Sequence, residues 1–421
     1  MKVGILTFHS SYNFGANLQT LAIHEMLKHR GCQPVVIDYR DSWKTEMYRS
    51  RVAPAQVEAH ERFIEKYLHT SPRFSCADEV QEYCEDELDL LLVGSDQVFR
   101  LRPKWTPKRV LRQLLRKDQS SAWTQVDERL PVYWLPWPKI EGRTPTRACI
   151  SACAGATMFF CLGRSLSREA RHCLSNFDFV SVRDDWTGWM VKWLSRGKVH
   201  PEFCPDPVFG LNDCFRVPPE ETARRDVSRT ILISAPLDAQ WLAEFRNLAH
   251  ERGFTISNLP DPHTPCAFDA SDSAIDLPLS PLTWYDLLSK AAGYIGIRYH
   301  GLVSCVANGT PAVSLDVSNR PRLLKVTSRP YDLCSKAGAQ RRYVPVNWLA
   351  HPSPAAVLGR LMDGPSQAAM DHYAEHAKAR LARVLDHVST RVGERTGLCL
   401  PRARGLCMSP RGRGETKTCN R

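Results

Sequence analysis

The opening of the chain constrains the fold most, because it has the pattern of one strand–helix–strand unit. Residues 3–8 form an apolar run, a loop with Gly and Asn follows, and a helix is predicted over about 17–30, ending at Gly31. A second apolar strand is expected at 34–38. Both runs are continuously apolar, as strands covered on both faces of a parallel sheet must be. The chain therefore predicts an α/β fold with a parallel sheet.

The strand–helix–strand pattern occurs in two parts of the chain. It suggests two Rossmann-like domains facing a cleft, the GT-B-like architecture. The segment boundaries that we predict are an N-terminal domain at 1–216, a linker at 217–229, a C-terminal domain at 230–350, C-terminal helices at 351–393 and a disordered basic tail at 394–421. The tail is rich in Arg, Gly, Pro and Ser and has little apolar surface to bury.

The positive charge of the chain is concentrated in two segments. Residues 100–117 contribute +8 and residues 394–421 contribute +5 of the total of +11, which leaves the rest of the chain near −2. A basic folded surface for nucleic acid is therefore not predicted. The chain enters its first strand at once and has no apolar run near eighteen residues, so we expect a cytoplasmic protein.

The fifteen cysteines do not have the spacing of a metal site. No C-x-x-C pair occurs, and neither the cysteines nor the acidic and histidine residues form a convincing ligand set. Several cysteines lie in apolar segments, where a reduced thiol packs as a small hydrophobic group. We therefore expect buried free thiols, no metal and no cofactor.

A short motif at residues 296–302 concentrates chemistry at a strand–helix junction. Arg298 and His300 follow an apolar strand and precede Gly301 and a small-residue helix predicted over 302–309. Ligands of open α/β sheets bind where strand carboxyl ends meet helix N-termini, which favour anions. The arginine suits phosphate or carboxylate, and the histidine can move a proton near neutral pH. The alternative is an arginine ion pair beside a core histidine.

Five segments in order resemble the polysaccharide pyruvyl transferase family. They are residues 2–21 (KVGILTFHSSYNFGANLQTL), 91–98 (LLVGSDQV), 179–184 (FVSVRD), 204–208 (CPDPV) and the motif Arg298–Gly301. The resemblance extends from residue 1 to about residue 320. It fails between about 100 and 147, where a basic stretch is followed by a sequence rich in Pro and Trp.

The resemblance implies transfer of the carboxyvinyl group of phosphoenolpyruvate to saccharide hydroxyls, which closes a pyruvate ketal. It implies that His300 moves the proton, that Arg298 binds the donor phosphate, and that Arg183 holds donor carboxylate or phosphate. An ion pair of Arg183 with Asp184 or Asp185 is the alternative. The acceptor would be a saccharide or a lipid-linked saccharide of polysaccharide biosynthesis, and phosphoenolpyruvate would be a co-substrate.

Two further loops provide acceptor-site candidates, each with a structural alternative. Asn13, Gly15 and Asn17 form a loop that opens a helix; the two amides would bind acceptor hydroxyls, or the loop is an ordinary cap. Asp96 lies at a strand end. It would act as a base, orient an acceptor hydroxyl, or cap the following turn. Asp206, in a Pro-Asp-Pro turn, is interpreted as architectural.

The basic segment and the fold leave other functions open. Residues 100–117 contain Leu and Val at helical spacing between cations, which suits peripheral contact with an anionic membrane surface or a mobile loop. The architecture also suits a nucleotide-sugar glycosyltransferase or a non-catalytic sugar- or anion-binding protein. The sequence does not indicate the oligomeric state, the acceptor sugar or the pathway.

Overall fold

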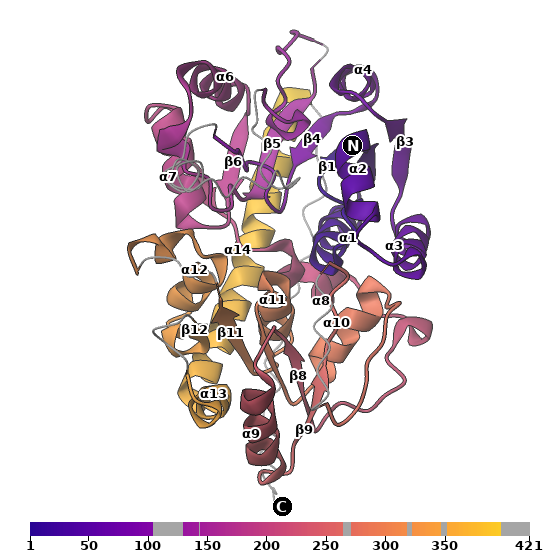
Figure 1. The fold of residues 1–421 in the computed structure, drawn as a ribbon. Helices are drawn as coiled ribbons and strands as arrows, with labels where there is room; N and C mark the ends of the chain where they lie inside the picture. Colours follow the sequence, from indigo (N-terminus) through magenta and orange to yellow (C-terminus); the bar gives the residue numbers. More distant parts are fainter. Residues whose placement is uncertain (104–128, 143, 264–270, 318–321, 347–351, 397–421) are drawn as a thin grey trace, which may run out of the picture.

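The fold consists of two parallel sheets that follow one another along the chain (Figure 1). The computed structural model describes residues 1–103, 129–142, 144–263, 271–317, 322–346 and 352–396. The predicted α/β class with two Rossmann-like domains is confirmed. The predicted tail lies almost wholly outside the described residues, as does most of the basic stretch 100–117.

The first sheet has seven parallel strands in the order β3-β2-β1-β4-β5-β6-β7. The strands are β1 (Lys2–Leu6), β2 (Gln33–Tyr39), β3 (Thr70–Phe74), β4 (Leu90–Val93), β5 (Thr146–Ala152), β6 (Phe179–Val182) and β7 (Glu202–Phe203). The helices of this region are α1 (Phe14–His29), α2 (Ser42–Arg49), α3 (Pro54–Tyr67), α4 (Ala77–Glu87), α6 (Arg164–Ser175), α7 (Asp185–Leu194) and α8 (Leu211–Cys214). Short 3-10 turns are η2 (Val132–Trp134), η3 (Phe159–Cys161) and η4 (Pro207–Gly210).

The second sheet has five parallel strands in the order β12-β11-β10-β8-β9. They are β8 (Thr230–Ser234), β9 (Thr255–Asn258), β10 (Gly293–Gly296), β11 (Ala312–Asp316) and β12 (Tyr343–Pro345). The associated helices are α9 (Ala239–His250), α10 (Pro281–Lys290), α11 (Tyr299–Ala307), α12 (Arg329–Lys336), α13 (Pro354–Leu361) and α14 (Gly364–Thr396), with turns η5 (Pro219–Glu221), η6 (Arg322–Thr327) and η7 (Gln340–Arg342).

Each sheet reverses its strand order at one point, and these points determine where a ligand-binding site is expected. In the first sheet the reversal lies between β1 and β4, and in the second it lies between β8 and β10. The first order is that of the Rossmann fold and the second is the flavodoxin-like variant. In both variants, ligands bind in the crevice at the reversal. This crevice lies just beyond the carboxyl ends of the strands.

The two sheets share a core, which fixes one domain against the other. One hydrophobic cluster includes Leu18 of α1, Leu232 of β8, Leu302 of α11 and Leu381 of α14. The rings of Phe14 and Trp284 stack with centroids 5.3 Å apart, which joins α1 to α10. The helices between the sheets are therefore a common layer.

The last helix, α14, runs from the second domain back along the first (Figure 1). Gln367 near its start donates to the carbonyl of Gly309, 3.1 Å away, and Arg380 further along donates to the carbonyl of Phe203, also at 3.1 Å. The helix extends to Thr396, three residues into the segment predicted as tail.

Part of the atypical stretch 100–147 belongs to the core of the first domain. Trp134 is fully buried and stacks on Phe99 with centroids 4.6 Å apart. The buried Arg147 donates from its guanidinium to the carbonyls of Trp137 and Pro138, both at 3.0 Å. The Trp/Pro-rich half of this stretch is therefore architectural, because its rings fill the space beside β4 and β5.

The described cysteines are all free thiols, and most of them are buried. Among the helices that the structure describes, none combines the length and the apolar character needed to cross a bilayer.

Candidate active site

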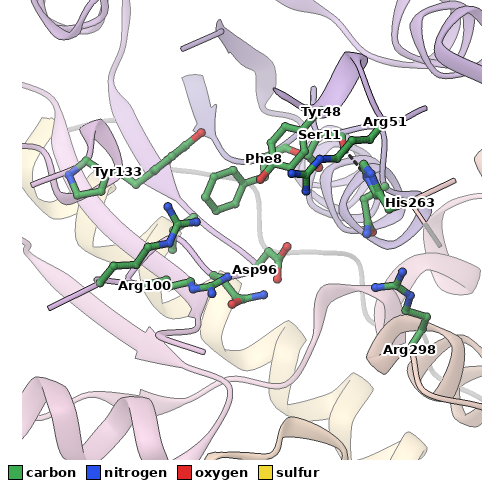
Figure 2. Close-up of a pocket in the computed structure, with 14 residues that line it drawn as sticks. Phe8, Ser11, Tyr48, Arg51, Asp96, Arg100, Tyr133, His263 and Arg298 are labelled. Carbon is green, nitrogen blue, oxygen red and sulfur yellow. Dashed lines mark hydrogen bonds between the residues drawn. The ribbon is translucent and has the colours of Figure 1, made fainter. Parts of the chain in front are cut away.

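A cavity of about 440 Å³ opens where the two reversal points face each other (Figure 2). Loops after β1 and β4 form much of its wall, and the second domain adds a residue of the loop after β9 and Arg298, two residues after β10. Its lining residues are Phe8, Ser11, Asn13, Tyr48, Arg51, Asp96, Gln97, Val98, Arg100, Arg102, Pro131, Tyr133, His263 and Arg298. Among these described lining residues, four are arginines and one is a carboxylate, so cations outnumber anions.

Arg298 lies on the cavity wall at the N-cap position of α11. Its extended backbone, with φ of −88° and ψ of 127°, lets the helix begin at Tyr299, three residues earlier than predicted. One guanidinium nitrogen donates to Asp261 at 2.6 Å, and the side chain is 33% exposed. The same Asp261 oxygen accepts from the backbone of His263 at 3.0 Å, so one carboxylate positions two cavity residues.

His263 of the second domain contacts the loop that follows β1. Its imidazole Nε2 lies 3.0 Å from the carbonyl oxygen of Ser11 (Figure 2). Burial lowers the pKa of His263. The sequence analysis did not identify this residue, because a histidine in a long loop after β9 has no local signal that brings it to the cleft.

His300 lies in the first turn of α11, beneath the cavity, and does not line it. Its ring packs on Gly15, where a β-carbon would lie 2.0 Å from the imidazole Cγ. The Nε2 atom has no hydrogen-bond partner among the described residues, and it lies 3.8 Å from Asp206. Burial lowers the pKa of His300 from 6.5 to about 4, against the opposing effect of Asp206 and Asp96. The imidazole is therefore neutral at pH 7.

Gly15 and Gly301 are required by close packing. Gly15 lies within α1, which begins at Phe14, and leaves room for the ring of His300. A β-carbon on Gly301 would meet the hydroxyl of Tyr294 at 2.3 Å. Gly301 therefore accommodates a core tyrosine beside the first turn of α11.

Arg183 follows β6 and is buried in a network of charges. Its guanidinium donates to Asp206 at 3.0 Å and to Asp96 at 2.9 Å, and its side chain is 1% exposed. It also lies over the ring of Tyr299, 4.9 Å from the centroid. Burial lowers the pKa of Arg183, but the neighbouring ionisable groups, including both carboxylates, raise it well above its usual value. The two predicted ion-pair partners were wrong, since Asp184 instead caps α7 and Asp185 pairs with Lys336.

Asp96 connects this network to the cavity. It has a left-handed backbone, with φ of 63°, which is uncommon for a residue other than glycine and is often found at functional sites. Its carboxylate accepts from Arg183 and lies 3.3 Å from Arg329. Although burial acts in the opposite direction, Arg183, His300 and Arg329 lower the pKa of Asp96. Asp96 is therefore an anion that faces the cavity.

Asp206 is the buried centre of the same network. One of its carboxylate oxygens accepts from Gln19 and from Arg183, and the other accepts from the backbone of Val208. Its proximity to His300 gives it an electrostatic effect on the imidazole. The architectural interpretation of its turn is therefore incomplete, since the carboxylate lies beside the candidate proton-transfer residue.

The two loop asparagines have different positions. Asn13 is the N-cap of α1, where its side chain accepts from the backbone of Ala16 at 3.2 Å, and it also lines the cavity. Asn17 is fully buried: its amide nitrogen donates to the carbonyl of His9 at 2.9 Å, and its oxygen lies 2.8 Å from His60 Nδ1. Asn17 therefore stabilises the loop from below and does not face an acceptor, because α1 begins earlier than predicted.

Several cavity residues were not identified as site candidates from the sequence. Tyr48 and Arg51 come from α2 and the turn after it, and Tyr133 from η2. Arg100 and Arg102 immediately follow the 91–98 segment, and that position was the only available signal. They were instead grouped with the basic stretch 100–117.

A second cavity of about 350 Å³ adjoins the first and shares Gln97 and Arg100 with it. Its wall includes Arg329, which follows η6 and lies 5.1 Å from the centroid of Tyr299. The ring of Tyr299 is thus contacted by two guanidinium groups, those of Arg183 and Arg329. Within the described ranges no group of three or more His, Cys, Asp or Glu side chains is arranged to hold a metal ion.

Comparisons with known proteins agree with this fold and with one family. A sequence profile described as polysaccharide pyruvyl transferase matches residues 13–319. No curated protein sequence matches the chain.

Among solved structures, a putative UDP-N-acetylglucosamine 2-epimerase from Listeria monocytogenes has a TM-score of 0.50 at 10% identity, covering 95% of this chain and 98% of its own. UGT89C1 from Arabidopsis thaliana, complexed with UDP-L-rhamnose, has a TM-score of 0.49 at 11% identity over 93% and 98%. The UDP-GlcNAc 2-epimerase of Neisseria meningitidis, bound to UDP-GlcNAc, has a TM-score of 0.47 at 11% identity over 93% and 100%. At such low identity the likeness concerns the fold alone.

Proposed function

The chain belongs to the polysaccharide pyruvyl transferase family, and from that premise we propose that it transfers the carboxyvinyl group of phosphoenolpyruvate to saccharide hydroxyls to form a pyruvate ketal. The acceptor in this proposal is a saccharide or lipid-linked saccharide of a cell-surface or exported polysaccharide.

The charge of the cavity is the observation that carries the proposal. Among the described residues, its lining includes the arginines Arg51, Arg100, Arg102 and Arg298 and one carboxylate, that of Asp96. Phosphoenolpyruvate carries a phosphate and a carboxylate, and guanidinium groups bind both through paired N–H donors. Arg298 holds the donor phosphate in this proposal, because it combines an exposed guanidinium with the N-terminus of α11.

His300 delivers the first proton in this mechanism. Its burial keeps it neutral at pH 7, but donor anions bound nearby raise its pKa and allow it to become protonated. The proton passes to the methylene carbon of the enol, and an oxocarbenium-like centre develops at the adjacent carbon. One acceptor hydroxyl adds to that carbon, inorganic phosphate leaves, and a second hydroxyl closes the ketal. Of the two hydroxyl protons, one replaces the proton given by His300 and one leaves with phosphate.

Asp96 and Arg183 have supporting roles in this mechanism. Asp96 is ionised and faces the cavity, so it accepts a proton from an attacking hydroxyl or orients it. Arg183 is held between Asp96 and Asp206. Its role is therefore to fix these carboxylates around His300, in place of the direct donor contact that the family resemblance implies.

The test is phosphate release from phosphoenolpyruvate by the purified protein with a panel of glycosides. His300→Asn should lower turnover at saturating donor by about 10²- to 10⁴-fold, the usual contribution of general acid–base catalysis, while donor affinity is largely retained. His372→Asn, at an exposed position on α14, is the matched control and should be unaffected.

Three results would count against this assignment. Near-native turnover of His300→Asn would remove the histidine from the chemistry. Loss of donor binding by the same variant would place it in the phosphate site. Protection by UDP or GDP, together with turnover of a nucleotide sugar, would favour a glycosyltransferase instead.

A further inference from the structure

An exposed cluster of aromatic rings lies on the first domain, on η3 and α7. Phe160 is 51% exposed, Trp189 is 49% exposed and Trp193 is 50% exposed. They are joined through two buried rings: Phe159 lies 5.6 Å from both Phe160 and Trp193, and Trp186 lies 6.2 Å from Trp189, between ring centroids. Large apolar side chains gathered in this way are characteristic of a binding surface.

The exposed charged residues in the sequence around these rings are almost all cationic. Between residues 159 and 198, a range that the structure describes throughout, Asp185 is the one exposed acidic residue. Its carboxylate lies 2.8 Å from the ammonium group of Lys336, so that charge is neutralised. The exposed cations of the same range are Arg164, Arg168, Lys192, Arg196 and Lys198.

Helical geometry places one of these cations, Lys192, beside the two exposed tryptophan rings. Trp189, Lys192 and Trp193 share one side of α7, since residues three and four apart are neighbours on a helix surface. Arg164 begins α6 four residues after Phe160. The two helices are held together by a hydrogen bond from Arg171 Nε to the carbonyl of Leu194 at 2.9 Å. They form one side of the first domain (Figure 1).

We propose that this aromatic–basic face, formed by Phe160, Trp189 and Trp193 with the five exposed cations, docks on the surface of an anionic lipid bilayer. Tryptophan is favoured at the level of the headgroups, where its ring is buried and its N–H stays hydrated. The surrounding Lys and Arg residues complement anionic headgroups. The residues of this face are other than 100–117 of the sequence, for which the sequence alone suggested membrane contact.

The position of the face relates it to the candidate active site. Helix α7 begins two residues after Arg183 and is ten residues long, which corresponds to about 15 Å. Docking through this helix therefore holds the cleft close to the headgroups. If the proposed function holds, this placement gives the cleft access to saccharides carried on a membrane lipid.

Vesicle flotation with the full chain tests the proposal. Wild-type protein should bind phosphatidylcholine vesicles containing phosphatidylglycerol and should bind pure phosphatidylcholine vesicles much more weakly. Lys192→Glu with Arg196→Glu should weaken binding by at least about 25-fold, since each lost cation near such a surface costs about fivefold and the two new carboxylates are repelled by the anionic headgroups. Trp189→Ser with Trp193→Ser should weaken it on the order of tenfold by removing the inserted rings.

The control is Arg224→Glu with Arg252→Glu, which makes the same change in net charge at exposed positions outside this face. This control should bind vesicles about as well as the wild type. Thermal unfolding and phosphate release with a soluble glycoside should be unchanged in all three variants, so failure of the proposed chemistry would leave the vesicle test intact.

Three results would overturn the docking proposal. One is equal binding of the wild type to both kinds of vesicle. Another is vesicle binding that survives both double substitutions at the face. A third is a dimer in solution that the tryptophan substitutions dissociate, which would assign the face to a second copy of the chain.

Discussion

Arg183 and Arg298 each follow a strand end, one in each domain, yet the protein surrounds them differently. Each follows the carboxyl end of a parallel strand, β6 for Arg183 and β10 for Arg298. Arg183 is 1% exposed between two carboxylates, whereas Arg298 is 33% exposed and is bonded to Asp261 on a cavity wall. Both arginines are therefore paired with carboxylates, and the difference between them is depth: Arg183 is enclosed by the protein, whereas Arg298 reaches the cavity wall.

The largest expected effect would come from removing the buried cation. Arg183→Met should lower the free energy of unfolding by about 3–5 kcal/mol, because it leaves Asp96 and Asp206 without their main partner in a buried site. Arg298→Met, the matched substitution on the exposed side, should cost about 1 kcal/mol or less. Urea unfolding of both variants measures the difference, and equal losses would show that depth does not separate the two arginines.

A change of pH tests the effect of burial on a second residue, His300. The folded-state pKa of His300, about 4, is below its ordinary value of 6.5, so the unfolded chain binds the proton more readily. This residue's contribution to stability is therefore complete above about pH 6.5 and is lost as pH falls toward 4. The loss amounts to at most about 3 kcal/mol.

The measurement is the free energy of unfolding of wild type and His300→Asn at several pH values. The wild type should lose more stability between pH 6.5 and 4 than the variant does. Parallel pH dependences of the two proteins would mean that the imidazole is not shielded from protons in the folded state.

The smallest expected effect concerns the exposed arginine. Arg298→Lys keeps the charge but loses the paired guanidinium donors, so affinity for phosphoenolpyruvate should fall about tenfold while the proton-transfer step survives. Calorimetric binding and single-turnover rates separate the two quantities. Unchanged donor affinity would move the phosphate to other arginines of the cavity, such as Arg100 or Arg102.

The sequence predicted the parts of the site that depend on strand order and helix ends. Arg298 and Asp96 were located at strand ends, and their side chains face one cavity because the carboxyl ends of parallel strands lie at the same edge. The assignments that depend on how deeply a residue is buried were less accurate. Asn17 is buried beneath the loop, and Gly15 serves the packing of His300. His263 and Arg329 had no recognisable sequence signal.

The sequence by itself determined the α/β class, the two domains and the strand ends that border the cavity, because apolar runs and helix caps are local patterns. The tertiary structure decided which charged groups cancel one another. Asp96, Arg183 and Asp206 are far apart along the chain, and they meet because β4, β6 and the turn after β7 converge beneath the cleft. Burial excludes water there, so the protein must pair these charges internally, and local sequence patterns do not specify that depth.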